Sequence, residues 1–122
     1  MRIVQIAQSD ESIKQLRKCL AIIFGKLSEV FGVPPDWGKT YIFNVSIEKH
    51  DGADPRGESW VAVYHSRDSV SPSTSESVIS VERYFDNENM QNEYGAVETV
   101  RFNWDNPEEA LTKVLDAVDR LK

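Results

Sequence analysis

The sequence has a single cysteine, Cys19, and this scarcity excludes two kinds of structure. One thiol cannot form an intramolecular disulfide, and it cannot build a zinc site from several thiolates. The sequence also lacks a charged-then-apolar secretory leader and any apolar run near the roughly 18 residues of a membrane-spanning helix. We therefore expect a soluble, cytoplasmic protein.

Basic side chains are the second scarcity. Lys and Arg total 14 against 20 for Asp and Glu, which gives a net charge of −6 and a pI near 4.9. This balance disfavours duplex nucleic acid and anionic membranes as partners, because both carry the same sign of charge. The excess is uneven: residues 1–40 carry six basic and four acidic side chains, residues 41–80 three and six, and residues 81–122 five and ten. The first third of the chain is thus mildly basic and the rest is acidic.

No recognisable catalytic or cofactor-binding motif is present. None of the six glycines belongs to a Gly-x-Gly-x-x-Gly or Gly-Lys-Ser/Thr pattern, so phosphate-binding loops are absent. Cys19 falls on an apolar helical stripe, where cysteine packs as a small hydrophobe. Possible metal ligands gather around one predicted hairpin tip, but Asp-Gly and Asp-Pro pairs there are typical of turns. These possible ligands are His50, Asp51, Asp54, Glu58 and His65. We predict a non-enzymatic protein with no cofactor, catalytic residue or metal site.

The first part of the chain predicts a strand followed by a long helix. Met1–Ala7 is short, apolar and β-branched, which favours a strand. Residues 10–31 carry apolar side chains three and four positions apart, as in an amphipathic helix. Gly32 and then Pro34-Pro35 end this helix. Its apolar stripe consists of Ile13, Leu16, Leu20, Ile23, Leu27 and Val30.

The remainder predicts strands and one further helix. The turn-rich residues 50–57 and the polar residues 86–92 each join two segments with strand patterns. Residues 66–77 contain six serines and predict a mobile loop. Asn106-Pro107-Glu108-Glu109 is a strong start for a terminal helix. The four predicted strand segments are residues 40–49, 60–65, 78–85 and 96–104.

The predicted order is therefore strand, long helix, four strands and terminal helix. Consecutive strands without intervening helices favour an antiparallel meander, with both helices packed on one face. We predict a single α+β domain over residues 1–122. Its architecture would be a two-layer sandwich with a mainly antiparallel sheet of four to five strands.

The helical stripe permits two arrangements. Its six residues occupy two heptad positions, so the helix could pair with the same helix of a second copy. The stripe could instead pack on the sheet of its own chain, which a seam of fewer than three heptads favours. The chain is therefore predicted to be a monomer or a homodimer through the first helix.

Carboxylates and one tyrosine in the two predicted strand-joining loops are candidate contacts with a partner. If these loops lie together, their negative field would steer a basic protein towards them. Tyr94 stands among polar residues and is the aromatic ring expected to be exposed. The candidate contacts are Asp51, Asp54, Glu58, Glu88, Glu93 and Tyr94.

In size, charge and its closing Asn-Trp-Asp-Asn-Pro-Glu-Glu helix start (residues 103–109), the chain resembles two groups of proteins. These are the small acidic immunity proteins paired with bacterial nuclease toxins, and phage-encoded anti-defence inhibitors. The resemblance implies an inhibitor that masks a basic surface on a partner such as a nuclease or toxin, and it carries over no residue roles. The alternative is a homodimeric ligand-binding or catalytic module. Its pocket would lie between sheet and helices, lined by Tyr64, His65 and Arg101.

Overall fold

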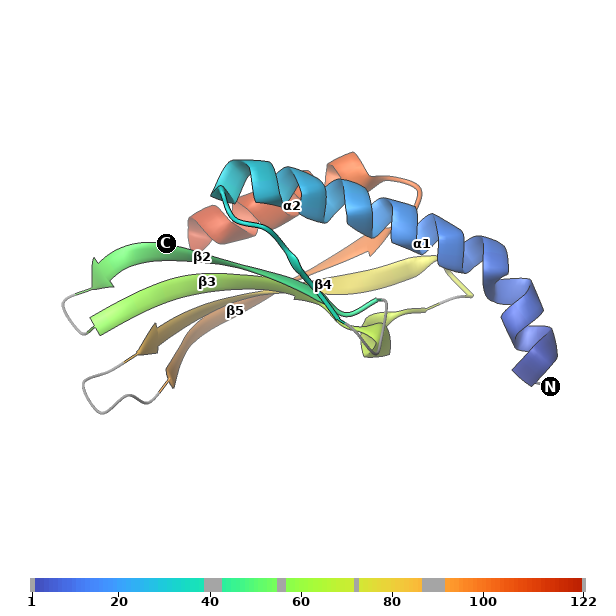
Figure 1. Cartoon of the computed structure of the whole chain (residues 1–122), viewed down its shortest axis with the longest axis horizontal. Helices are drawn as coiled ribbons and strands as arrows, with labels where there is room; N and C mark the ends of the chain where they lie inside the picture. The colour runs from blue at the N-terminus through green and yellow to red at the C-terminus, as the bar shows by residue number, and fades with distance from the viewer. Residues whose placement is uncertain (1, 39–42, 55–56, 72, 87–91, 122) are drawn as a thin grey trace.

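The chain forms a five-stranded antiparallel sheet with two helices on one face (Figure 1). The computed structural model describes residues 2–38, 43–54, 57–71, 73–86 and 92–121. It describes side chains within residues 11–38, 43–50, 59–71, 73–85 and 95–121. The predicted α+β class, the antiparallel sheet and the placement of both helices on one face are confirmed. Within the described residues, neither helix is long and apolar enough to cross a membrane.

The first helix, α1, runs from Arg2 to Phe31. The prediction of a strand over the first seven residues is therefore wrong, since residues 2–7 form the opening turns of this helix. A short apolar run fits either a strand or a helix, and here it continues directly into a long helical pattern. The helix ends as predicted, because Gly32 has a φ of 73° and its N–H donates to the Ser28 carbonyl at 2.8 Å. Lys49 Nζ donates to the Phe31 carbonyl at 3.2 Å and ties this end to the sheet.

The five strands follow one another in the sheet in chain order. The short β1 was not expected, and it supplies the fifth strand in place of the first residues of the chain. The strands around both hairpins extend further than predicted, so residues 50–54 belong to a strand rather than to a turn. The serine-rich segment contains a short 3₁₀ helix, Arg67–Ser69, and its last two residues belong to β4. The strands are β1 Asp36–Trp37, β2 Val45–Asp54, β3 Gly57–His65, β4 Glu76–Asp86 and β5 Asn92–Asn103.

The second helix, α2, runs from Pro107 to Arg120 and begins as its sequence predicts. The Asn106 side chain accepts from the Glu109 N–H at 3.2 Å and donates to the Glu109 carboxylate at 3.0 Å. The first of these bonds satisfies a backbone donor that the first helical turn leaves unpaired, and the second holds the capping side chain in place. Both helices lie above the sheet in Figure 1, and the sheet's lower face carries no helix.

The core lies between the helices and the upper face of the sheet. The apolar stripe of α1 is used within the chain, since four of its six residues are buried there. Trp104 closes one end of this core, where its Nε1 donates to Ser77 Oγ at 2.9 Å. The buried residues of α1 are Leu16, Cys19, Leu20, Ile23, Phe24, Leu27 and Phe31. They meet Val45, Ile47, Val61, Val63, Ile79, Val81, Val100 and Phe102 from the sheet, and Ala110, Val114, Ala117 and Val118 from α2.

Two truncations on α1 test this packing. Leu27→Ala should lower the free energy of unfolding by about 2–5 kcal/mol, because it removes a fully buried side chain. Val30→Ala is the matched control, since Val30 is 59% exposed and the change should stay within about 0.5 kcal/mol. Urea denaturation followed by circular dichroism measures both. Equal losses for the two variants would contradict the buried stripe.

Candidate functional site

Three aromatic rings form a row across the helix-free face of the sheet. The register pairs His50 with Trp60 and Trp60 with Tyr84, so the three side chains are neighbours on adjacent strands. His50 and Trp60 stack at 5.3 Å between ring centroids, and Trp60 and Tyr84 stack at 5.6 Å. Their interplanar angles are 21° and 13°. Such cross-strand aromatic contacts stabilise a sheet face that no helix covers.

A buried carboxylate occupies the next row of the same face. Glu82 lies between Ala62 and Val97 in the register and is only 2% exposed. Ser80 Oγ donates to its carboxylate at 3.2 Å, and the Tyr84 hydroxyl donates at 2.5 Å. The Tyr64 hydroxyl also bonds to Glu82, and this bond is the main reason that the pKa of Tyr64 is raised. Three hydroxyls from two strands therefore converge on one carboxylate.

This convergence determines which hydroxyl groups of the face can donate hydrogen bonds to other molecules and which can only accept them. A tyrosine hydroxyl has one proton, and once it donates that proton to Glu82 its oxygen can only accept. Hydrogen bonds to a carboxylate are stronger than those between neutral groups, so this orientation is held firmly. Tyr64 is 37% exposed, and its hydroxyl also forms a hydrogen bond with Ser80, which lowers its pKa and so acts against the effect of Glu82. Because its proton is directed at Glu82, the Tyr64 hydroxyl can offer other groups only its acceptor oxygen.

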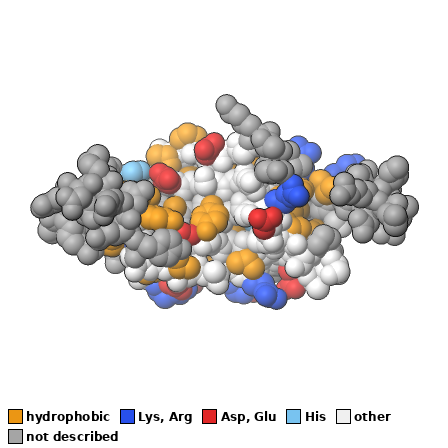
Figure 2. All heavy atoms as spheres, turned by 90° about the horizontal axis from the view of Figure 1, so that it is seen from below, with side chains coloured by type: hydrophobic (Ala, Val, Ile, Leu, Met, Phe, Trp, Pro, Cys, Tyr) orange, Lys and Arg blue, Asp and Glu red, His pale blue; other side chains and the backbone are white. Residues whose placement is uncertain are grey.

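The surroundings of these rows are apolar and charged. Figure 2 views the helix-free face and shows hydrophobic side chains across its middle, while most Lys and Arg side chains lie towards its margins. Val97 is exposed on β5, beside Glu82 in the register. On β2, the exposed Glu48 carboxylate lies 3.4 Å from His50 Nε2. The face therefore combines apolar area with acceptors, the exposed Glu48 carboxylate and, on β5, the exposed guanidinium of Arg101.

The register brings the sequence-predicted contacts to one end of the sheet. Asp54 closes the β2–β3 pairing opposite Gly57, and Glu58 pairs with Asp86 on β4. Glu93 pairs with Phe85 at the same end, where Figure 1 shows both hairpins pointing the same way. Of the remaining candidates, Asp51 lies in β2, Tyr94 pairs with Tyr84 and Glu88 lies outside the described residues. The side chains of all six lie outside the described part of the structure, so their role as contacts stays a prediction.

Sequence reasoning missed Glu82 and the aromatic row. In the sequence, Ser80, Glu82 and Tyr84 alternate with buried residues and are typical of a solvated strand face. An acidic chain has many solvated carboxylates, so nothing marks this one as buried. The signal that could have found it is the pairing of Ala62 with Glu82, which places Tyr64 and Tyr84 within reach. That pairing requires the strand register, which alternation alone does not supply.

Two of the three residues of the alternative pocket are brought together, since Tyr64 and His65 both line a hollow of about 300 Å³ beside β1 and β2, whereas Arg101 is not part of it. Tyr64 and His65 are consecutive in β3 and point to opposite faces, while Arg101 is exposed on β5, two strands away. His65 is buried in the core, with its Nδ1 at 2.7 Å from the Phe43 carbonyl and its ring edge-on to Phe102. Because a carbonyl only accepts, Nδ1 carries the proton. Burial lowers the pKa of His65, and its Nε2 has no hydrogen-bond partner among the residues that the structure describes.

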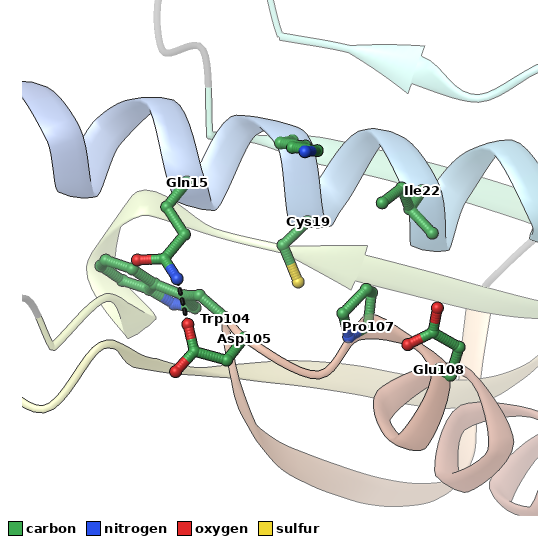
Figure 3. A pocket seen from close by; sticks show the side chains of 8 residues that line it. Gln15, Cys19, Ile22, Trp104, Asp105, Pro107 and Glu108 are labelled. Carbon is green, nitrogen blue, oxygen red and sulfur yellow. Dashed lines mark hydrogen bonds between the residues drawn. The ribbon is translucent and has the colours of Figure 1, made fainter.

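Cys19 lines a cavity of about 350 Å³ between α1 and the start of α2 (Figure 3). Burial, and then the charges of Asp105 and Glu108, raise the pKa of the thiol to about 11. Gln15 bridges the two elements by donating to Asp105 across the mouth of the cavity. A thiol with this pKa is protonated at neutral pH, so it is not an activated nucleophile. Within the described residues, no three His, Cys, Asp or Glu side chains are grouped to hold a metal ion.

Comparison with protein-family models, with curated proteins and with solved structures finds no match to this chain. The functional assignment therefore rests on the chemistry of the helix-free face.

The buried histidine predicts a pH dependence of stability. The pKa of His65 is below its ordinary value of 6.5 in the folded chain, so below pH 6.5 the unfolded chain takes up a proton that the folded chain does not. The free energy of unfolding should therefore be independent of this group above about pH 6.5 and should fall as the pH decreases below it. Urea denaturation at pH 7.5, 6.5 and 5.5 measures the trend. The imidazole proton resonance of His65 should keep its neutral shift below pH 6.5, and titration at or above that pH would refute the assignment.

Proposed function

We propose that the chain is a small acidic, non-enzymatic protein-binding module, an inhibitor that masks a basic surface on a partner protein. The observation that carries the proposal is the buried carboxylate of Glu82 beneath the tyrosine hydroxyls of the helix-free face. Lys and Arg side chains only donate hydrogen bonds, and oxygens that only accept match them. A partner rich in Lys and Arg is therefore the one whose chemistry fits this face.

The aromatic residues supply the apolar part of such an interface. Trp60 and Tyr84 are partly buried and held by stacking, so little side-chain entropy would be lost when a partner covers them. Tyr64 stands beside them with its hydroxyl oriented by Glu82. Tyrosine and tryptophan are enriched among the residues that dominate binding energy. The face thus offers pre-oriented anchors and acceptors together.

The acidic end of the sheet completes the proposed surface. The predicted contacts in the two hairpins continue the same strands that carry the aromatic row, and Glu58 precedes Trp60 by two residues in β3. Carboxylates at the margin of an interface mainly accelerate association and raise its salt dependence. We assign this steering role to Asp51, Asp54, Glu58, Glu88 and Glu93, with Tyr94 as a further contact.

In this proposal the chain acts as a monomer. The stripe on α1 that a second copy would need is packed within the chain, with Leu20 and Leu27 fully buried. Pairing through that stripe would require α1 to leave the sheet and expose the core.

Two substitutions on the helix-free face test the proposal. The chain captures its partner from lysate of its native host, and the purified pair is then measured by calorimetry. Tyr64→Phe and Glu82→Gln should each weaken binding about 10- to 100-fold, because each removes or reverses an acceptor opposed to a charged donor. Asp116→Asn is the control, since it removes the same charge from the exposed side of α2. If the captured protein binds the native chain and all three variants with equal affinity, it does not bind this face. That result would overturn the proposal.

The acidic end is tested separately by salt. Glu88→Gln together with Glu93→Gln should slow association with the captured partner and flatten the dependence of its affinity on sodium chloride between 50 and 500 mM, because steering by exposed charges is screened by salt. Surface plasmon resonance measures both quantities. An unchanged affinity and slope would remove the acidic end from the proposed surface while leaving the aromatic face in place.

A further inference from the structure

A second hollow lies on the helix-bearing side of the molecule, between α1 and β1. It has a volume of about 530 Å³ and is lined by Arg17, Lys18, Ala21, Trp37 and Gly38. This volume lies within the roughly 300–1,000 Å³ of most small-molecule sites. The α1–β1 cleft, as we call it, is separated from the helix-free face by the sheet, so it is a distinct surface.

The floor of the α1–β1 cleft contains an exposed indole. Trp37 is 40% exposed although it is held in place by its strand pairing with Val45. Its ring meets Phe24 of α1 in an edge-on contact at 6.3 Å and 61°. Gly38 follows, and its N–H donates to the Asn44 carbonyl at 2.6 Å. An aromatic surface is therefore fixed in orientation and still open to a ligand.

The rim of the α1–β1 cleft is cationic. Arg17 and Lys18 are consecutive on α1 and both are exposed. Within the described residues, neither side chain forms a hydrogen bond or an ion pair. Asp36, the acidic neighbour of Trp37, is the preceding residue of β1, and alternation along a strand directs it to the opposite side. The described lining of this cleft thus holds two cations and no carboxylate, while Lys18 also borders the Cys19 cavity, which Asp105 and Glu108 line as well.

We infer that the α1–β1 cleft binds a small aromatic anion. The aromatic ring of the ligand stacks on Trp37, and its carboxylate, sulfonate or phosphate group pairs with Arg17 and Lys18. The planar guanidinium of Arg17 suits a bidentate contact with such a group, and Lys18 adds a point charge. The apolar floor removes water from the ion pair, which strengthens it. The charge preference is opposite to that of the helix-free face.

The test uses 8-anilino-1-naphthalenesulfonate as the probe, with its fluorescence as the readout. The neutral N-phenyl-1-naphthylamine serves as the uncharged comparison. The native chain should bind one sulfonate probe, and Arg17→Gln with Lys18→Gln should weaken that binding at least tenfold without changing the binding of the neutral compound. Trp37→Leu should weaken the binding of both compounds. The matched control is Lys14→Gln with Lys26→Gln, which removes the same charge from other exposed positions of α1 and should leave the affinity unchanged.

Two results would overturn this inference. One is equal loss of affinity in the control and the cleft variants, which would mean that the probe responds to net charge alone. The other is a set of amide shift changes, on addition of the sulfonate probe, that spares Ala21 and Gly38. Circular dichroism verifies that each variant is folded. Because the cleft and the helix-free face share no residues, failure here leaves the proposed protein partner untouched.

Discussion

The pairing register of β3 and β4 is the constraint on which the rest of the structure depends. It aligns Val63 with Val81 towards the helices and Ala62 with Glu82 away from them. Side chains alternate between the two faces of a sheet, so a shift of one residue would exchange every inner side chain for an outer one. Glu82 would then enter the core beneath the helices, and two valines would face solvent. The apolar contacts with the helices therefore determine which side chains lie on the opposite face of the sheet, although they involve none of those side chains.

That opposite face contains a group that stability alone does not require. An apolar side chain between Ala62 and Val97 would bury itself without needing any hydrogen bonds, whereas a buried carboxylate needs several. Ser80, Tyr64 and Tyr84 provide them, and this fixes the direction in which the hydroxyl protons point. A buried polar network of this kind specifies one arrangement of side chains, and partial satisfaction would be costly. The network thus holds the hydroxyls of this face in one orientation.

The sequence predicts those parts of the fold that local pattern determines. The stripe of α1 from residue 10 onward, its end at Gly32, and the Asn106 cap of α2 depend on neighbours along the chain, and all three agree with the structure. The prediction for residues 2–7 was wrong because a short apolar run fits the period of a strand and that of a helix equally well. The sequence did not predict the burial of Glu82 for a different reason. Its burial depends on partners from β3, which are distant in sequence. Contacts between residues close in the chain can therefore be predicted from the sequence, whereas contacts between strands can be predicted only once the strand register is known.

The division of charge along the chain is only partly a division in space. The mildly basic first third contains α1 and β1, which line a cationic cleft. The acidic remainder forms most of the sheet and also α2, whose exposed carboxylates Glu108, Glu109, Asp116 and Asp119 lie on the same side of the sheet as α1. A molecule with charges separated in this way has an electric dipole as well as a net charge. A basic partner of the kind proposed would be repelled by the cations of α1 and attracted by the carboxylates of the sheet and of α2. Forces between exposed charges act over about 10 Å at ordinary salt, so they would bear on the approach of such a partner before contact.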